Sequence, residues 1–238
     1  MISEKTLTQL AKKYQTDDRT VLREYFQHLF LSYFYQHGET DRIYFKGGTA
    51  LRLIYRSPRF SEDIDFSAGL TTTAPLEHAV IDTLSAIAKE GVATDLDEAK
   101  PTTGGYIANI NFIAYERSVG IRLEVSLRKG KKAGTLATIV NDFVPDYTVL
   151  QLEESQLIGE KIAALLSRKK PRDFYDFYFL LRANLIPKKR ETFEAALKTL
   201  EETDIRFDSE LREFLPKSHH MIIRNFKETL EREIKRYL

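Results

Sequence analysis

The hydrophobic pattern of the first forty residues predicts helices. In the segment RTVLREYFQHLFLSYFYQHG, residues 19–38, apolar side chains recur at the spacing of one helix face, and Gly38 ends the pattern. Asp18 directly precedes this segment, and its side chain is of a type that caps helix N-termini. We therefore expect a long helix with Asp18 as its cap.

The next segment predicts a strand, a tight turn, a helix and a second strand in close succession. Residues 42–45 form a short apolar strand that ends at Gly47 and Gly48. A helix over residues 49–55 is expected directly after the glycines. In the run FSEDIDFS, residues 60–67, acidic and apolar residues alternate as they do in a half-buried strand.

The rest of the chain changes from mixed structure to helices alone. Pro75 opens a helix that ends at Gly91, and two alternating runs at residues 106–115 and 120–127 predict a β-hairpin. After about residue 152 every pattern is helical. We expect helices over residues 154–167, 172–183, 190–203 and 218–237.

This order of elements predicts an α+β fold of two domains, residues 1–150 and 151–238. The length of 238 residues allows one sizeable core with a smaller appended domain. No apolar run approaches the roughly 20 residues that span a bilayer, and the N-terminus lacks the apolar core of a secretion signal. We therefore expect no membrane partner and a cytoplasmic location.

The composition excludes some chemistries and leaves others open. With no cysteine, the chain cannot use disulfides, thiolate nucleophiles or zinc–thiolate sites. A net charge of +1 gives no global field that would indicate a nucleic-acid partner. Basic residues nevertheless cluster at 128–132, 168–172 and 188–190, either as solvated surface or as a phosphate-binding surface.

Asp63 and Asp65 are candidate metal ligands. They are two residues apart on an expected strand, so both side chains project from one face, while Ile64 and Phe66 anchor the other face in the core. Two like charges this close are stabilised by a hard divalent cation, and Mg²⁺ typically takes one or two protein carboxylates plus substrate phosphates. Glu124 faces away from its apolar neighbours and is a candidate third carboxylate.

The glycine pair and a lysine are candidate anion-binding groups. A strand that turns through Gly47 and Gly48 straight into a helix exposes backbone N–H groups, which suits a phosphate, although tight turns also use such pairs. Lys161 falls on the apolar face of its helix. It either reaches the edge of the core or binds an internal anion such as a triphosphate. Asp173 and Asp176 share a core-facing stripe, and Lys161 or Arg172 could be their partner.

Two blocks of the sequence carry a resemblance to a known family. The first is FKGGTALRLIYRSPRFSEDIDFS, residues 45–67, and the second is EKIAALLSRKKPRDFYDFYFLL, residues 160–181. Together they resemble the signature of the AbiEii-type toxin nucleotidyltransferases, within the DNA polymerase β-like nucleotidyltransferase superfamily. The resemblance implies a nucleotidyltransferase core with a mixed sheet, followed by a helical domain that completes the active site.

The resemblance also implies roles for individual residues. Asp63 and Asp65 match the metal-binding pair, and Lys161 matches an essential lysine. Asp176 matches a late acidic residue, with Asp173 as the competing candidate, and Glu124 matches a third carboxylate more loosely. The turn residues that match the triphosphate-binding pair, with the hydroxyl nearest to it, are Gly47, Gly48 and Thr49.

The implied activity is transfer of a nucleoside monophosphate from an NTP to an acceptor hydroxyl, with Mg²⁺ or Mn²⁺ as the cofactor. Glu124 or one of the aspartates would deprotonate that hydroxyl. The resemblance implies a toxin of a toxin–antitoxin or phage-defence system, with a cognate antitoxin as a partner. The implied acceptor is the 3′ end of tRNA, on a basic surface formed by Arg128, Lys129, Lys131, Lys132, Arg168, Lys169 and Lys170.

Two other functions remain open at this point. The same residues could transfer a nucleotide or a phosphoryl group to a protein hydroxyl. The chain could also be a nucleotide- or RNA-binding module without turnover, although such a module has little use for two adjacent carboxylates that face a phosphate.

Overall fold

The computed structural model describes residues 1–127, 130 and 132–238, which divide into two compact units. The first unit contains residues 1–56 and 60–153, and the second contains residues 154–238 together with residues 57–59. The chain therefore enters the second unit for three residues, just before the acidic run, and then returns. No pattern in the sequence predicted this excursion.

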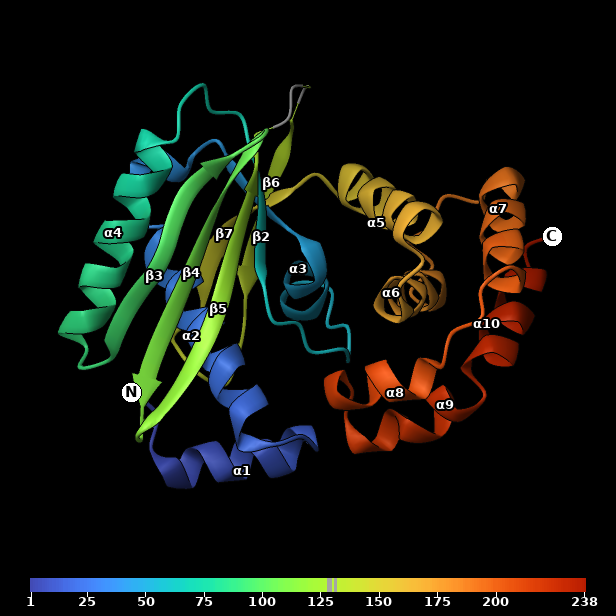
Figure 1. The fold of residues 1–238 in the computed structure, drawn as a ribbon, viewed down its shortest axis with the longest axis horizontal. Helices are drawn as coiled ribbons and strands as arrows, with labels where there is room; N and C mark the ends of the chain where they lie inside the picture. The colour runs from blue at the N-terminus through green and yellow to red at the C-terminus, as the bar shows by residue number, and fades with distance from the viewer. Residues whose placement is uncertain (128–129, 131) are drawn as a thin grey trace. The chain divides into compact units, whose positions relative to one another are not determined.

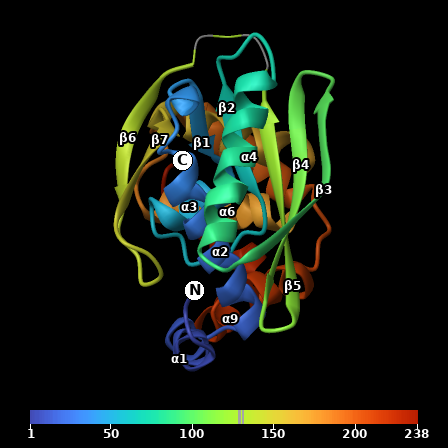
Figure 2. The same ribbon diagram turned by 90° about the vertical axis from the view of Figure 1, so that its left-hand side faces the viewer.

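The first unit is built on one mixed sheet of seven strands in the order β3-β4-β5-β2-β1-β7-β6. Figure 2 shows β3 and β6 at its two edges. The central strand β2 runs antiparallel to β1 and parallel to β5. The strands are β1 Ile43–Lys46, β2 Ile64–Ala68, β3 Ala93–Thr102, β4 Gly105–Ala114, β5 Arg117–Ser126, β6 Gly134–Ile139 and β7 Tyr147–Leu152.

Aromatic side chains of helix α2 cover one face of this sheet. The ring of Phe34 lies 5.1 Å from that of Phe66 on β2, and the ring of Phe26 stacks on Phe112 of β4 at 4.8 Å. The core of the first unit therefore lies between α2 and the sheet, and α4 packs on α2 and β3. The helices of this unit are α1 Glu4–Tyr14, α2 Asp18–Phe34, α3 Gly47–Leu53 and α4 Ala74–Lys89.

The second unit contains only helices among its described elements, coloured orange to red in Figure 1. Its core is aromatic, with the ring of Phe226 stacked on Tyr175 at 5.8 Å and in edge contact with Phe207 at 5.1 Å. The helices are α5 Glu154–Arg168, α6 Pro171–Arg182, α7 Arg190–Glu201, α8 Phe207–Leu211, α9 His220–Arg224 and α10 Phe226–Lys235.

The α+β class predicted from the sequence is confirmed, with several local corrections. The cap of α2 is Asp17, whose carboxylate accepts from the N–H of Thr20, and Asp18 is already helical. The single helix expected over residues 218–237 is wrong, because Asn225 leaves helical geometry and separates α9 from α10.

Strands β3, β6 and β7 were not predicted. Strand β3 carries charged residues at an exposed sheet edge, so it lacks the apolar alternation of a half-buried strand. Strands β6 and β7 have six residues each. Among the described residues no helix has the length and hydrophobicity needed to cross a membrane.

Candidate functional site

Asp65 lies on the face of β2 opposite to the aromatic core. Ile64 and Phe66 are 1% and 0% exposed, and Phe66 contacts α2, so the alternation of the strand directs Asp65 to the other face. Asp63 immediately precedes β2, and both acids are half-buried. For Ile64, Asp65 and Phe66 the predicted division into an apolar and an acidic face is confirmed. Asp63 lies outside the strand, and its projection from the same face as Asp65 stays a prediction.

Gly47 lies directly against the carboxylate of Asp65. Its φ of +84° is in the left-handed region, and a Cβ at this position would lie 2.0 Å from Oδ2 of Asp65. Glycine is therefore required here both by the backbone conformation and by the close approach of the acid. Helix α3 begins at this residue, so its first-turn N–H groups lie next to an acidic side chain of the neighbouring strand.

The loop that leads to Asp63 is held by side chains of α2 and α3. The hydroxyl of Thr49, which is fully buried, donates to the carbonyl oxygen of Asp63. The amide of Gln27 donates to the carbonyl oxygens of Ser61 and Glu62 at 2.9 and 3.1 Å. The hydroxyl of Thr49, expected to contact a triphosphate, thus has a different partner in the structure and positions the backbone of Asp63.

Strand register brings two further charged residues next to Asp65. Lys46 lies opposite Asp65 across the β1–β2 ladder, and Glu124 lies beside it on the parallel strand β5. Paired residues of neighbouring strands project from the same face, so Lys46 offsets part of the acidic charge. Sequence reasoning missed Lys46, although its place directly before the glycine pair was a usable signal.

Glu124 has a partner of its own. Its carboxylate forms an ion pair with Arg122 at 2.7 Å, and both side chains are about half exposed. Its role as a general base stays a prediction. Within the described residues no three or more histidine, cysteine, aspartate or glutamate side chains gather as a ready metal site. Two carboxylates beside a turn of backbone N–H groups nevertheless fit an ion such as Mg²⁺, which takes its remaining ligands from water and phosphates.

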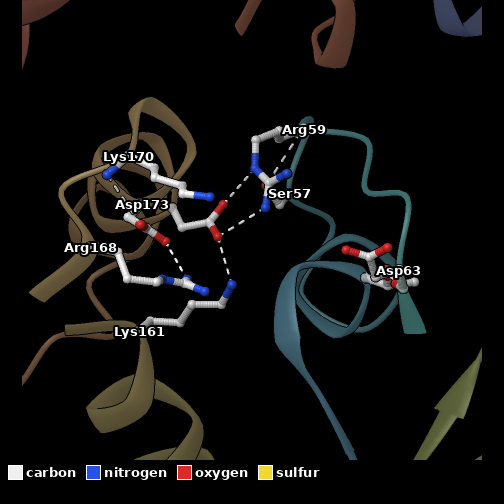
Figure 3. A network of polar contacts seen from close by, with 9 residues as sticks. Ser57, Arg59, Asp63, Lys161, Arg168, Lys170 and Asp173 are labelled. Carbon is white, nitrogen blue, oxygen red and sulfur yellow. Dashed lines mark hydrogen bonds and ion pairs between the residues drawn. The ribbon is translucent and has the colours of Figure 1, made fainter. Parts of the chain in front are cut away.

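In the second unit, Asp176 forms a buried ion-pair network with Arg59 and Lys161. Figure 3 labels these two cations. Arg59 donates to both of its oxygens, from Nε at 2.7 Å and from Nη2 at 2.9 Å, and Nζ of Lys161 donates to Oδ2 at 2.7 Å. The side chains of Asp176, Arg59 and Lys161 are 2%, 4% and 11% exposed. Lys161 therefore has the carboxylate of Asp176 as its partner, whereas its contact with a triphosphate stays a prediction.

The two cations keep Asp176 ionised although it is buried. Burial alone would raise the pKa of this carboxyl, but the charges of Arg59 and Lys161 and their hydrogen bonds lower the pKa to about 2. The charge of Asp176 in turn outweighs burial and raises the pKa of Arg59. Arg59 was missed as the partner of Asp176; the signal was an arginine placed beside the acidic run.

Asp173 and Asp176 have different tasks. Asp173 accepts from the backbone N–H of Lys170 at the start of α6 and from Arg168 at 2.6 Å, as Figure 3 shows. It therefore stabilises the N-terminus of its helix, where negative charge is favoured. Asp176 alone of the two contacts Lys161 in the described structure, which favours it over Asp173 as the late acidic residue.

The predicted RNA-binding residues are only partly described. Arg128, Lys129 and Lys131 lie outside the described residues. Lys132 is half-buried, and Arg168 is half exposed while it pairs with Asp173. Lys169 lies 3.6 Å from Glu202, and Lys170 is exposed at the start of α6. A role for these residues in RNA binding stays a prediction, as does the convergence of Lys161 on the two aspartates, which belong to the other unit.

Comparisons with solved structures support the fold. MenT4, a nucleotidyltransferase toxin from Mycobacterium tuberculosis, matches with a TM-score of 0.65 at 15% identity, covering 100% of this chain and 93% of the other. A putative nucleotidyltransferase from H. pylori matches with a TM-score of 0.60 at 16% identity, covering 93% of this chain and 99% of the other. JHP933 from Helicobacter pylori gives the same score and identity, covering 93% and 95%.

Comparisons of sequence identify the family. A search of curated proteins finds no match. The family model described as the nucleotidyl transferase AbiEii toxin of type IV toxin–antitoxin systems matches residues 29–236. This range includes the glycine turn, the acid pair and the Lys161–Asp176 network. The chain is therefore a member of the AbiEii family of nucleotidyltransferase toxins.

Proposed function

We propose that this nucleotidyltransferase moves a nucleoside monophosphate from an NTP to a hydroxyl at the 3′ end of an RNA, with tRNA as the favoured acceptor and Mg²⁺ or Mn²⁺ as the cofactor. The observation that carries the proposal is the contact between Gly47 and Asp65. It places the start of a helix, which favours phosphate, beside a carboxylate, which favours a cation. A polyphosphate bound with a metal ion needs both.

Each residue has a defined task in this proposal. Asp63 and Asp65 would hold the ion, which when bound neutralises charge on the phosphates and lowers the pKa of the acceptor hydroxyl. The first-turn N–H groups of Gly47 and Gly48 would bind phosphate oxygens. The hydroxyl of Thr49 would keep Asp63 in place through its hydrogen bond to the backbone. Glu124 or one of the aspartates would accept the proton of the attacking hydroxyl. As the hydroxyl oxygen bonds to the α-phosphorus, the bond from that phosphorus to the oxygen of the β-phosphate would break, and pyrophosphate would leave.

Lys161 would bind the β- or γ-phosphate, with Asp176 and Arg59 fixing the position of its amine. A lysine held by a buried carboxylate has little freedom to reorganise, and electrostatic groups that are fixed in advance contribute most to a transition state. The side chain of Lys161 remains 11% exposed, against 2% for Asp176, so it is the less deeply buried partner of this pair. Arg59, at 4% exposure and with two bonds to Asp176, is a positioning residue.

The test uses purified protein with Mg²⁺, each of the four NTPs labelled at the α-phosphate, and total RNA. We expect label in RNA of tRNA size, lost when a chelator is present and lost in Asp63→Ala. Glu39→Ala, which removes an exposed acid of the loop before β1, is the control that should keep full activity. Label in RNA from the Asp63→Ala protein would overturn the proposal.

Parallel arms separate the competing acceptors and groups. Transfer of label from the γ-position instead of the α-position would indicate phosphoryl transfer. Label in protein instead of RNA would indicate a protein hydroxyl as the acceptor. Either result would contradict RNA nucleotidyl transfer. A co-expressed antitoxin, which family membership favours, should suppress any growth arrest that the active toxin causes.

A further inference from the structure

A strip of polar side chains lies along one side of helix α2, whose other buried residues are mostly apolar. Arg23, Glu24 and Gln27 form this strip, because residues three and four apart share one side of a helix. Glu24 and Gln27 are buried, at 6% and 1% exposure. Burying a polar group costs free energy unless hydrogen bonds replace those to water, so the partners of this strip indicate its task.

The side chain of Gln27 holds two successive carbonyl groups of the segment before Asp63. Its Nε2 donates to the carbonyl oxygen of Ser61 at 2.9 Å and to that of Glu62 at 3.1 Å. Successive carbonyl groups point to opposite sides of an extended strand, so one amide can reach both only where the chain bends, and the backbone bends at Glu62. Among the described residues no backbone N–H of a turn or loop donates to either oxygen. A side chain of α2 therefore holds this bend in place of a backbone turn.

The two charged members of the strip hold the same segment through its side chains. Arg23 pairs with Glu62 at 2.8 Å, but the carboxylate side chain is 43% exposed, and ion pairs at such exposure contribute little. Glu24 binds Arg52, whose guanidinium carbon lies 4.0 Å from the ring centre of Phe60. Both of these contacts act on side chains, whereas the amide of the strip holds the backbone.

Asp63 is held on both sides of its Cα atom. The carbonyl group of Glu62 belongs to the planar peptide unit before this atom, and the carbonyl group of Asp63 belongs to the unit after it. Gln27 donates to the first carbonyl oxygen and Thr49 donates to the second. Two peptide planes held in this way set φ and ψ of Asp63, and with them the direction in which its side chain leaves the backbone.

We propose that Gln27 is a positioning residue for the acid pair, which raises the affinity of the pair for Mg²⁺ or Mn²⁺ by fixing the peptide unit before Asp63; this inference rests on the proposed function. Asp65 needs no such support, because the ladders with β1 and β5 set its place. Without the amide, the carboxylate of Asp63 would have more directions open to it, and ordering it on binding would cost conformational entropy. Groups that orient a metal ligand typically contribute about 10–100-fold in affinity, and we expect the lower end because Gln27 acts through the backbone.

The first test measures the binding of Mn²⁺ alone to the full-length protein, from the electron paramagnetic resonance signal of the free ion. We expect the Kd to rise about tenfold in Gln27→Met, which keeps the approximate size of the side chain and removes its N–H donors. Ile87→Val, fully buried in α4, is the control for a loss of core packing and should bind as tightly as the unchanged protein. An equal Kd in Gln27→Met would overturn the proposal.

A second variant guards against damage to the fold in Gln27→Met. Thr49→Val is close in size to the original residue and removes the hydrogen bond on the other side of Asp63. We expect weaker Mn²⁺ binding here as well. The double variant should lose less binding free energy than the sum of the two single losses, because removal of either anchor already frees the carboxylate. Fully additive losses would contradict a shared action on Asp63.

A third measurement needs no metal ion. Amide hydrogen exchange over residues 60–63 should be faster in Gln27→Met than in the unchanged protein and in Ile87→Val, because local opening of this segment controls its exchange. Equal exchange in all three proteins would contradict the role of Gln27 in holding the bend. Absence of nucleotide transfer, with Mn²⁺ binding that still depends on Gln27, would count against the proposed function alone. An unchanged protein that binds no Mn²⁺ would overturn both.

Discussion

The acid pair of the first unit and the ion-pair network of the second unit place carboxylates in opposite surroundings. Asp63 and Asp65 are half-buried at the start of a strand, two residues apart, with a glycine turn against one of them. Asp176 is fully buried among helices and is bound by two cations of its own unit. Partly exposed acids in close proximity suit an external cation, whereas a buried acid with two cationic partners suits rigid positioning of one of those partners.

The largest expected effect is on catalysis at the acid pair. Asp65→Asn keeps the size and the register of β2 but removes one of two charges that would hold the ion. We expect nucleotide transfer to fall by at least about 10³-fold, or about 4 kcal/mol in transition-state stabilisation. Initial rates with α-labelled NTP measure the loss, and the thermal midpoint shows whether the fold is intact.

The control for this variant is Asp82→Asn, which changes an exposed acid on α4. Its rate should equal that of the unchanged protein. An Asp65→Asn protein with a normal rate would show that the acid pair has no catalytic task, and the contrast between the two carboxylate clusters would lose its functional meaning.

The second expected effect is on stability at the buried network. Asp176→Ala leaves Arg59 and Lys161 without their shared anion, and removing one partner of a buried ion pair costs about 3–5 kcal/mol. Denaturant unfolding measures this loss as a lower midpoint. A change below about 1 kcal/mol would indicate that solvent replaces the lost partner, contrary to a closed network.

Lys161→Met separates stability from catalysis within the same network. Asp176 keeps both bonds to Arg59 in this variant, so the loss of stability should be smaller than in Asp176→Ala. If the amine also binds a phosphate, transfer should fall by about 10²-fold or more with the fold retained. Full activity in Lys161→Met would restrict this lysine to a structural role.

The third expected effect concerns the turn beside the acid pair. Gly47→Ala requires a left-handed backbone and a Cβ in the space of the Asp65 carboxylate, so it should cost roughly 1–3 kcal/mol of stability. Displacement of Asp65 should also lower transfer by about 10²-fold. Gly69→Ala is the matched control, because its added Cβ would contact nothing within 4 Å and its φ is not positive. Equal stability of both variants would contradict the close contact.

The smallest expected effect is the pH dependence of stability from Asp176. The pKa of Asp176 is about 2 in the folded protein, against 3.8 for an unperturbed aspartate. Its contribution to stability is therefore complete above about pH 4 and is lost as the pH falls to about 2. A shift of this size corresponds to about 2 kcal/mol. Denaturant midpoints of the unchanged protein and Asp176→Asn, measured between pH 5 and 2, should converge as the pH falls, and parallel curves would contradict the network.

The sequence by itself determined the elements whose pattern is local. The alternation of FSEDIDFS was sufficient to predict that Ile64 and Phe66 are buried and that Asp65 lies on the other face of the strand, and both predictions are confirmed. The two sequence blocks were sufficient for the family and the α+β class, because a family signature depends on residue types and spacing alone. Helical periodicity also allowed the prediction that Lys161 pairs with an acidic residue on the core-facing side of helix α6.

Only the tertiary structure decided which residues meet across long distances in the chain. The pairing of Arg59 with Asp176, 117 positions later, depends on three residues that leave one unit and join the other. The contact of Gly47 with Asp65 depends on strand register, and strands β6 and β7 pair in a ladder that weak local patterns did not reveal. A local sequence pattern reflects only the conformational preference of its own segment. These contacts depend on burial and on strand pairing between distant segments, which exist only once the chain is folded.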